Sequence, residues 1–251
     1  MTIDPNLHSL ASHFKELKIR LIYTLIFFFI SFFLSYFYVE KIYQFLLTPL
    51  NEQWLNQDKH MIYTNLAEIF FSYLKLAYYA ALSLTIPFFF SQIYIFIAPG
   101  LYKNERRTLI PFLIATPILF FLGMLFVYYF IFPLAWKFFL SFEQSVAPTS
   151  LPMKLEAKVS EYLSLAVNMI IAFGLAFQMP IILALLAKID IITAQGLKNK
   201  RRFAIVLIFI LAAILTPPDA ISQIGLAIPM IILYELSILI CAKINKDRKD
   251  A

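Results

Sequence analysis

The chain has little of what soluble enzymes and metalloproteins usually depend on. Its 251 residues include five glycines, three histidines and a single cysteine, Cys241, and only 14% of them are charged. One cysteine excludes an intramolecular disulfide and a cysteine metal cluster, and His8, His13 and His60 do not have zinc-ligand spacing. The sequence also lacks a Gly-x-Ser-x-Gly elbow, a phosphate-binding glycine loop and a metal-spaced His-Glu pair. We therefore expect no catalytic site, no metal and no cofactor.

Apolar residues are abundant instead. Hydrophobic residues make up 61% of the chain and aromatic residues 17%, and apolar runs recur along its whole length. A bilayer is the natural solvent for such a composition. The net charge of +6 lies in short basic clusters between the apolar runs, which is typical of membrane orientation signals and unlike a nucleic-acid-binding stripe. We expect an integral membrane protein that contacts lipids and binds no nucleic acid.

Six apolar segments predict an all-α, polytopic membrane protein with six transmembrane helices. The fifth segment has 13 residues, which at about 1.5 Å per residue span roughly 20 Å of a hydrocarbon core about 30 Å thick. The fifth and sixth helices are thus predicted to be short. No repeat or low-complexity linker divides the chain, so we expect one domain over residues 1–251. The segments are Leu21–Val39, Ile69–Ala98, Leu109–Phe132, Tyr162–Ala187, Phe203–Leu215 and Ile224–Ala242.

A proline turn separates the last two segments. The residues Thr216-Pro217-Pro218-Asp219 follow the fifth segment directly. Because proline ends a helix and aspartate is a good N-cap, we expect one helix to stop here and Asp219 to begin the next.

The distribution of Lys and Arg predicts the orientation. With the N-terminus inside, 15 of the 21 basic residues fall in the inner regions and five in the outer loops, while Lys75 lies near the outer end of the second span. Inner loops are normally the basic ones. Both termini are therefore predicted to lie on the inner side.

Two carboxylates stand at the predicted inner face. Glu16 lies just before the first span and Glu105 just before the third. Paired carboxylates can bind paired guanidinium groups, with each charge-assisted hydrogen bond worth about 1.5–3 kcal/mol where water is partly excluded. Two alternatives stay open: Glu16 can pair with Arg20 one turn later, worth about 0.2–0.5 kcal/mol, and Glu105 can stabilise the positive end of the third helix or pair with a neighbouring arginine.

Two polar residues lie inside predicted spans. Gln178 is in the fourth segment, two residues before Pro180, and Glu235 is in the sixth. Polar side chains in a bilayer usually face protein or water and often carry function. Because Pro180 frees the carbonyl of Ala176, the Gln178 amide either satisfies backbone groups at the kink or binds a partner or substrate.

These motifs together resemble the TatC family of twin-arginine protein translocases. Residues 13–21 (HFKELKIRL) are similar to the family's N-terminal His-Leu-x-Glu-Leu-Arg-x-Arg signature, and residues 96–107 (FIAPGLYKNERR) to its Phe-x-x-Pro-x-Leu-x-x-x-Glu-Arg-Arg loop. Further similarities are at 123–134 in the third span, 173–180 in the fourth, 215–219 in the turn and 227–235 in the sixth. The resemblance covers nearly the whole chain in order.

The resemblance implies a receptor that recognises twin-arginine signal peptides of folded cargo proteins. It also implies a concave, glove-like shape, a bacterial inner membrane or, for an organelle-encoded chain, a mitochondrial inner membrane, and transport driven by the protonmotive force. The implied partners are single-span proteins of the TatA and TatB type, with the chain forming a homo-oligomer within a hetero-complex. The implied signal-peptide-binding residues are Glu16, Leu17, Phe96, Pro99, Leu101, Tyr102 and Glu105.

Other residues receive roles from the resemblance as well. Phe177 and Gln178 are implied to face the concave, lipid-accessible pocket and to help contact the single-span partners, and Glu235 is expected as an intramembrane residue. A structural role is implied for Pro49, in the amphipathic outer stretch, as for Pro217, Pro218 and Asp219 of the turn. Gln178 stands where many family members have glutamate, so any mechanism that needs a negative charge there is in doubt.

Two other classes of protein remain as alternatives. A small-molecule or ion-coupled transporter would need a polar cavity near the midplane, with paired broken helices or a repeat. The sequence shows neither paired broken helices nor a repeat. An intramembrane enzyme would need a nucleophile paired with a base within the spans, and the predicted spans contain no such pair.

Overall fold

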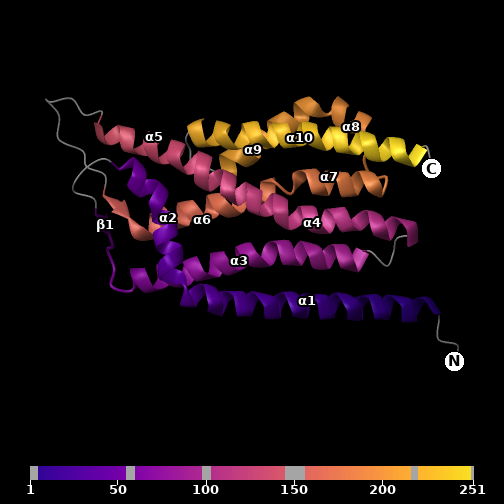
Figure 1. Cartoon of the computed structure of the whole chain (residues 1–251), viewed down its shortest axis with the longest axis horizontal. Coiled ribbons are helices and arrows are strands. Elements are labelled where there is room, and N and C mark those ends of the chain that lie inside the picture. The colour runs from indigo at the N-terminus through magenta and orange to yellow at the C-terminus, as the bar shows by residue number, and fades with distance from the viewer. Residues whose placement is uncertain (1–4, 55–59, 98–102, 145–155, 216–219, 250–251) are drawn as a thin grey trace. The chain divides into compact units, whose positions relative to one another are not determined.

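The long apolar stretches form helices, because a bilayer offers no partner for backbone N–H and C=O groups and a helix pairs them internally. The computed structural model describes residues 5–54, 60–97, 103–144, 156–215 and 220–249, and the arrangement is mainly helical there (Figure 1). Its elements are α1 (Pro5–Phe37), α2 (Val39–Gln53), β1 (Met61–Ile62), α3 (Glu68–Ile97), α4 (Lys103–Phe126), the π-helical segment η2 (Val127–Ile131), α5 (Phe132–Gln144), β2 (Ala157–Lys158), α6 (Val159–Ala176), α7 (Met179–Lys188), α8 (Ala194–Asn199), α9 (Arg201–Leu215) and α10 (Ala220–Lys249).

Five helical stretches among the described residues are long and apolar enough to cross a membrane, which confirms a helical membrane protein. They are Phe14–Phe37, Glu68–Phe96, Pro111–Ser141, Val159–Lys188 and Gln223–Lys246. The predicted fifth span corresponds to α9, which has 15 residues and is indeed short. The sixth is not short: α10 has 30 residues, because the polar residues after the apolar segment continue the helix. The number of helices that cross the membrane stays a prediction.

Two predicted spans are interrupted. The third consists of α4, η2 and α5 in direct succession, and the fourth is divided between α6 and α7. The break in the fourth follows from Pro180, which has no N–H to donate and occupies the first turn of α7. Nothing in the apolar pattern of the third segment signals the π-helical turn.

The residues fall into two compact units. The first comprises residues 1–39 and 73–118, and the second residues 40–72 and 119–251. Helices α3 and α4 each contribute residues to both units. The single domain and the concave shape expected from the sequence stay predictions.

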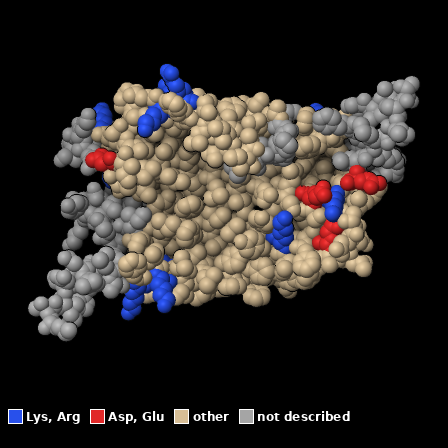
Figure 2. All heavy atoms as spheres, turned by 180° about the vertical axis from the view of Figure 1, so that it is seen from behind, with Lys and Arg blue, Asp and Glu red and all other residues tan. Residues whose placement is uncertain are grey.

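In the first unit α1 lies beside α3 and runs antiparallel to it (Figure 1). Phe27 stacks on Phe88 with ring centroids 4.4 Å apart, and Phe28 meets Tyr78 edge-on at 5.6 Å. Most other large side chains of α1 are exposed, as suits a helix with lipid on most of its sides. Across the surface drawn in Figure 2, charged side chains are few.

In the second unit α10 packs along α7 and α9 (Figure 1), while the end of α4 crosses α6 closely at two glycines. A Cβ on Gly123 would lie 2.6 Å from the carbonyl oxygen of Phe173, and one on Gly174 would lie 2.8 Å from the ring of Phe120. No side chain fits at such distances, so this crossing requires glycine on both helices. It is built without Gly-x-x-x-Gly spacing.

Helix α2 contains Pro49, and the hydroxyl of Tyr128 compensates for the donor that proline lacks. Pro49 has no N–H for the carbonyl of Phe45 four residues earlier, and this carbonyl accepts the hydroxyl of Tyr128 at 2.9 Å. The rings of Phe45 and Tyr128 stack with centroids 4.2 Å apart. The hydroxyl of Tyr162 donates to the next carbonyl, that of Leu46. Because Tyr128 lies in η2 and Tyr162 in α6, both helices hold α2 in place.

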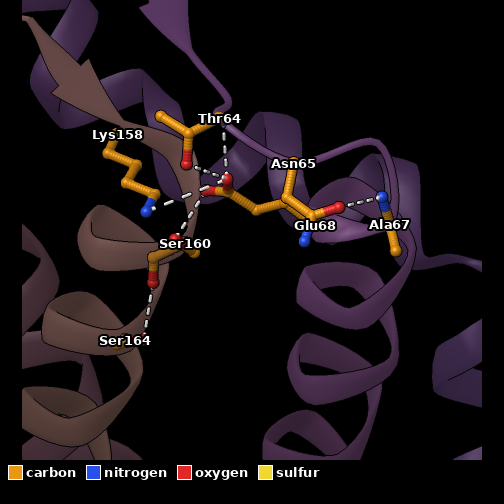
Figure 3. A network of polar contacts seen from close by, with 7 residues as sticks. All are labelled: Thr64, Asn65, Ala67, Glu68, Lys158, Ser160 and Ser164. Atoms are coloured by element: carbon orange, nitrogen blue, oxygen red, sulfur yellow. Dashed lines mark hydrogen bonds and ion pairs between the residues drawn. The ribbon is translucent and has the colours of Figure 1, made fainter.

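A carboxylate joins the loop before α3 to the start of α6 (Figure 3). Glu68 accepts hydrogen bonds from the Thr64 backbone N–H at 2.8 Å and from the Ser160 hydroxyl at 2.6 Å, and Lys158 Nζ lies 3.9 Å from its Oε2. Next to this network, β1 and β2 pair in parallel, with Met61 opposite Ala157. These bonds fix the ends of two loops that are far apart in the sequence.

The pairing of Pro49 with Tyr128 is testable by a double-mutant cycle. Tyr128→Phe leaves the Phe45 carbonyl without a donor and should cost about 1–3 kcal/mol of unfolding free energy. In a Pro49→Ala background the alanine N–H can donate to that carbonyl, so the same change should cost clearly less. Thermal or denaturant unfolding of the four proteins in detergent micelles measures the difference.

Tyr162→Phe is the matched control. Its acceptor, the Leu46 carbonyl, lies four residues before Leu50, whose N–H is present whatever residue 49 is, so the cost of Tyr162→Phe should not depend on residue 49. An equal cost of Tyr128→Phe in both backgrounds would contradict the account of Pro49.

Candidate functional site at the predicted inner face

In the first unit, the guanidinium group of Arg20 on α1 is held by side chains of two helices. Arg20 donates to Glu16 Oε1 from Nε at 3.1 Å and from Nη2 at 2.5 Å, and its Nη1 donates to Gln92 Oε1 on α3 at 3.3 Å. The Arg20 side chain is 19% exposed and that of Glu16 is 33% exposed. The alternative in which Glu16 pairs with Arg20 is thus confirmed, and Gln92 joins the pair from a second helix.

An open pocket of about 320 Å³ lies against this ion pair. Lys15, Glu16, Ile19, Arg20 and Tyr23 line it, all from one face of α1. These residues follow helical spacing, and α1 continues from Pro5 through this region without a break. The Glu16 carboxylate is therefore reachable from outside, at the edge of an apolar surface.

The structure describes only some of the other predicted signal-peptide-binding residues. Leu17 is exposed on α1, and Phe96 is partly buried on α3 one turn after Gln92. Glu105 falls in the first turn of α4, which begins at Lys103, while its side chain is outside the described part. Pro99, Leu101 and Tyr102 lie outside the described residues.

Glu16 and Glu105 belong to the same unit and to the same end of it. Figure 1 shows the start of α1, the end of α3 and the start of α4 together at that end. That both carboxylates lie at the inner membrane face stays a prediction. A carboxylate beside an amide oxygen, at the edge of apolar helices, can bind a planar guanidinium.

Phe177 and Gln178 are buried, and the role expected for them in contacting single-span partners stays a prediction. Phe177 is 6% exposed and Gln178 is 1% exposed, and the Phe177 ring packs 5.8 Å from that of Phe126. Both lie at the break between α6 and α7, where the Gln178 carbonyl accepts from the N–H groups of Ile181 and Ile182 at 3.0 Å. The break turns these side chains inward. Whether the Gln178 amide satisfies backbone groups at the kink stays a prediction.

Glu235 is in the middle of an apolar stretch, as predicted, and has a basic partner that the sequence did not reveal. Its Oε2 accepts from Arg201 Nη2 at 2.6 Å, with side chains 44% and 48% exposed. Residues Pro217, Pro218 and Asp219 of the turn lie outside the described residues.

The shortness of α9 brings Arg201 to Glu235. With 15 residues, α9 is about 22 Å long, half the length of the 30-residue α10. The two helices run antiparallel, since Gln223 donates to the Phe209 carbonyl at 3.2 Å, so α9 begins level with the middle of α10. The Tyr234 hydroxyl donates to the Leu197 carbonyl at 2.9 Å and ties α8 to the same level.

The fold defines a helical membrane protein, and its candidate site holds a guanidinium group of the chain itself. Comparisons with known proteins give the family. Residues 12–229 match the family model of the Sec-independent protein translocase protein TatC. The TatC of Rickettsia prowazekii is 46% identical over 96% of both chains, and that of Escherichia coli K12 is 36% identical over 91% of this chain and 86% of its own. The chain belongs to the TatC family.

Further comparisons agree. A TatC-like protein of Reclinomonas americana is 38% identical over 93% of this chain and 86% of its own. A crystal structure of the twin-arginine translocase receptor TatC superposes with a TM-score of 0.77, at 33% identity, over 93% of this chain and 99% of the other. The family is a non-catalytic component of a translocation system, and the transporter and enzyme alternatives are therefore set aside.

Charge reversal tests the pair of Arg201 and Glu235. Arg201→Glu and Glu235→Arg each create a like-charge contact and should lower the thermal midpoint, while the double variant restores the pair. Because both side chains are nearly half exposed, we expect a coupling energy of only about 0.2–1 kcal/mol. Strictly additive single effects, measured by unfolding in detergent, would contradict the contact.

Proposed function

We propose that the chain is the receptor subunit of a twin-arginine translocase. It binds the paired arginines of signal peptides on folded cargo through Glu16 and Glu105, with Leu17, Phe96, Pro99, Leu101 and Tyr102 around them. The observation that supports this most is the Arg20 guanidinium, held by the Glu16 carboxylate and the Gln92 amide. The site already has the chemistry that an arginine ligand requires.

The membrane arrangement follows from the same proposal. Six helices cross the membrane with both termini on the inner side, so Glu16 and Glu105 meet cargo before transport. The membrane is the bacterial inner membrane, or the mitochondrial inner membrane if the chain is organelle-encoded. Family members in bacteria such as Rickettsia prowazekii and Escherichia coli support the first assignment.

The remaining steps involve partners. After recognition the signal peptide inserts against the apolar helices, and single-span proteins of the TatA and TatB type are recruited to a complex with several copies of the chain. The protonmotive force supplies the energy. Membership of a translocase family supports these partners as a class.

The role of Glu105 is testable with a synthetic twin-arginine signal peptide. Glu105→Ala removes a carboxylate whose charge-assisted hydrogen bonds are worth about 1.5–3 kcal/mol each, so affinity should fall about tenfold to a hundredfold or more. Membrane insertion should be unchanged. Fluorescence anisotropy with a labelled peptide and the full-length protein in lipid nanodiscs measures the affinity.

Glu40→Ala is the matched control. It removes an exposed carboxylate at the start of α2, which the proposed topology places on the outer side, and should leave the affinity unchanged. Equal affinities of wild type and Glu105→Ala would remove Glu105 from the site.

A further inference from the structure

An arginine of the chain itself occupies the carboxylate that the proposed function assigns to cargo. Arg20 bridges Glu16 on its own helix and Gln92 on α3. The guanidinium of a signal-peptide arginine has the same shape, the same charge and the same donors. Both cannot sit between Glu16 and Gln92 at once.

We infer that Glu16 and Gln92 form a guanidinium-binding site that Arg20 fills in the absence of cargo, and that a signal-peptide arginine enters by displacing Arg20. This inference rests on the proposed function, because it describes how the same site is kept occupied and then opened. It adds Gln92 to the site and gives Arg20 the role of an internal competitor.

The geometry makes the exchange easy. Both Arg20 hydrogen bonds to Glu16 end on Oε1, so Arg20 does not use the carboxylate in the bidentate way that gives arginine its strongest contacts. A cargo arginine that approaches through the open pocket beside the pair can take both carboxylate oxygens. Arg20 is four residues from Glu16 on a continuous helix, so only side-chain rotation is needed to release it.

The occupied site also predicts selection against lysine. An ammonium group is a point charge, whereas a guanidinium is a planar fork whose separate N–H groups reach two acceptors at once. Only the second can replace Arg20 between a carboxylate on α1 and an amide oxygen on α3. A lysine peptide would have to displace Arg20 with fewer bonds in return.

The test measures the affinity of a labelled twin-arginine peptide, and of its Lys-Lys variant, for the full-length chain in nanodiscs at fixed salt. Arg20→Gln removes the competitor and should bind the arginine peptide about two- to fivefold more tightly than wild type, the gain expected from losing one partly exposed ion pair. Arg20→Lys keeps the charge without the planar guanidinium, so its affinity for the arginine peptide should lie between those of wild type and Arg20→Gln.

Two further variants separate competition from other effects. Lys18→Gln removes the positive charge of an exposed residue from the same turn of α1. It controls for reduced repulsion of a basic peptide. Its affinity for the arginine peptide should rise less than that of Arg20→Gln. Gln92→Met in the Arg20→Gln background removes the second acceptor and should weaken binding about two- to tenfold.

The outcomes distinguish this inference from the proposed function. If Arg20→Gln inserts normally and discriminates the two peptides but binds the arginine peptide no more tightly than Lys18→Gln, Arg20 is no competitor and the receptor function stands. An unchanged affinity on Gln92→Met in that background would remove Gln92 from the site. If wild type binds both peptides equally, the proposed function itself fails.

Discussion

Neither hydrocarbon nor a packed protein interior contains water to pair with a backbone carbonyl or N–H group, so each interruption of a helix in such surroundings needs a local donor or acceptor. The chain meets this constraint in two ways. At Pro49 the freed carbonyl of Phe45 accepts the Tyr128 hydroxyl, and at the break before Pro180 the N–H groups of Phe177 and Gln178 donate to the carbonyls of Phe173 and Leu175. Each proline therefore also affects how the helices pack. The carbonyl that Pro49 frees binds Tyr128, which holds α2 against η2. The helix break at Pro180 turns the Phe177 side chain inward.

The same constraint limits where charge can be placed, and the proposed recognition site uses one of the few places that remain. In the first unit, Glu16 stands at the edge of the apolar stretch with an open pocket beside it. In the second unit, the short α9 brings Arg201 to Glu235, so a carboxylate in the middle of α10 has a partner. The first pair joins two neighbouring turns of one helix beside an open pocket, which suits exchange. The second joins two helices and suits a structural role.

The sequence predicts the helices well, because apolar runs and proline positions are local signals. It also places Glu16 and Glu105 at one face from the distribution of Lys and Arg, and it offers Arg20 as a partner of Glu16 from helical spacing. Local signals of this kind do not predict contacts between segments that are distant in the sequence. Gln92 reaching Arg20, Tyr128 reaching Phe45, and Arg201 reaching Glu235 depend on how helices align, and alignment depends on the whole packed unit. The sequence did not indicate the burial of Phe177 and Gln178 either, for the same reason. A polar residue near the inner end of an apolar segment, as Gln92 is, was the one available signal that was missed.

Site-specific photocrosslinking tests the central claim most directly. A photoreactive residue in place of Leu17 or Phe96, which leaves Glu16 and Glu105 intact, or in place of Glu40 as a control, would be combined with a twin-arginine signal peptide or its Lys-Lys variant in membranes that contain the inserted protein. The account predicts adducts from positions 17 and 96 with the arginine peptide, their loss with the lysine peptide, and none from position 40. Adducts that are equal for both peptides, or absent at positions 17 and 96 in well-inserted protein, would contradict a receptor that reads arginine at this face.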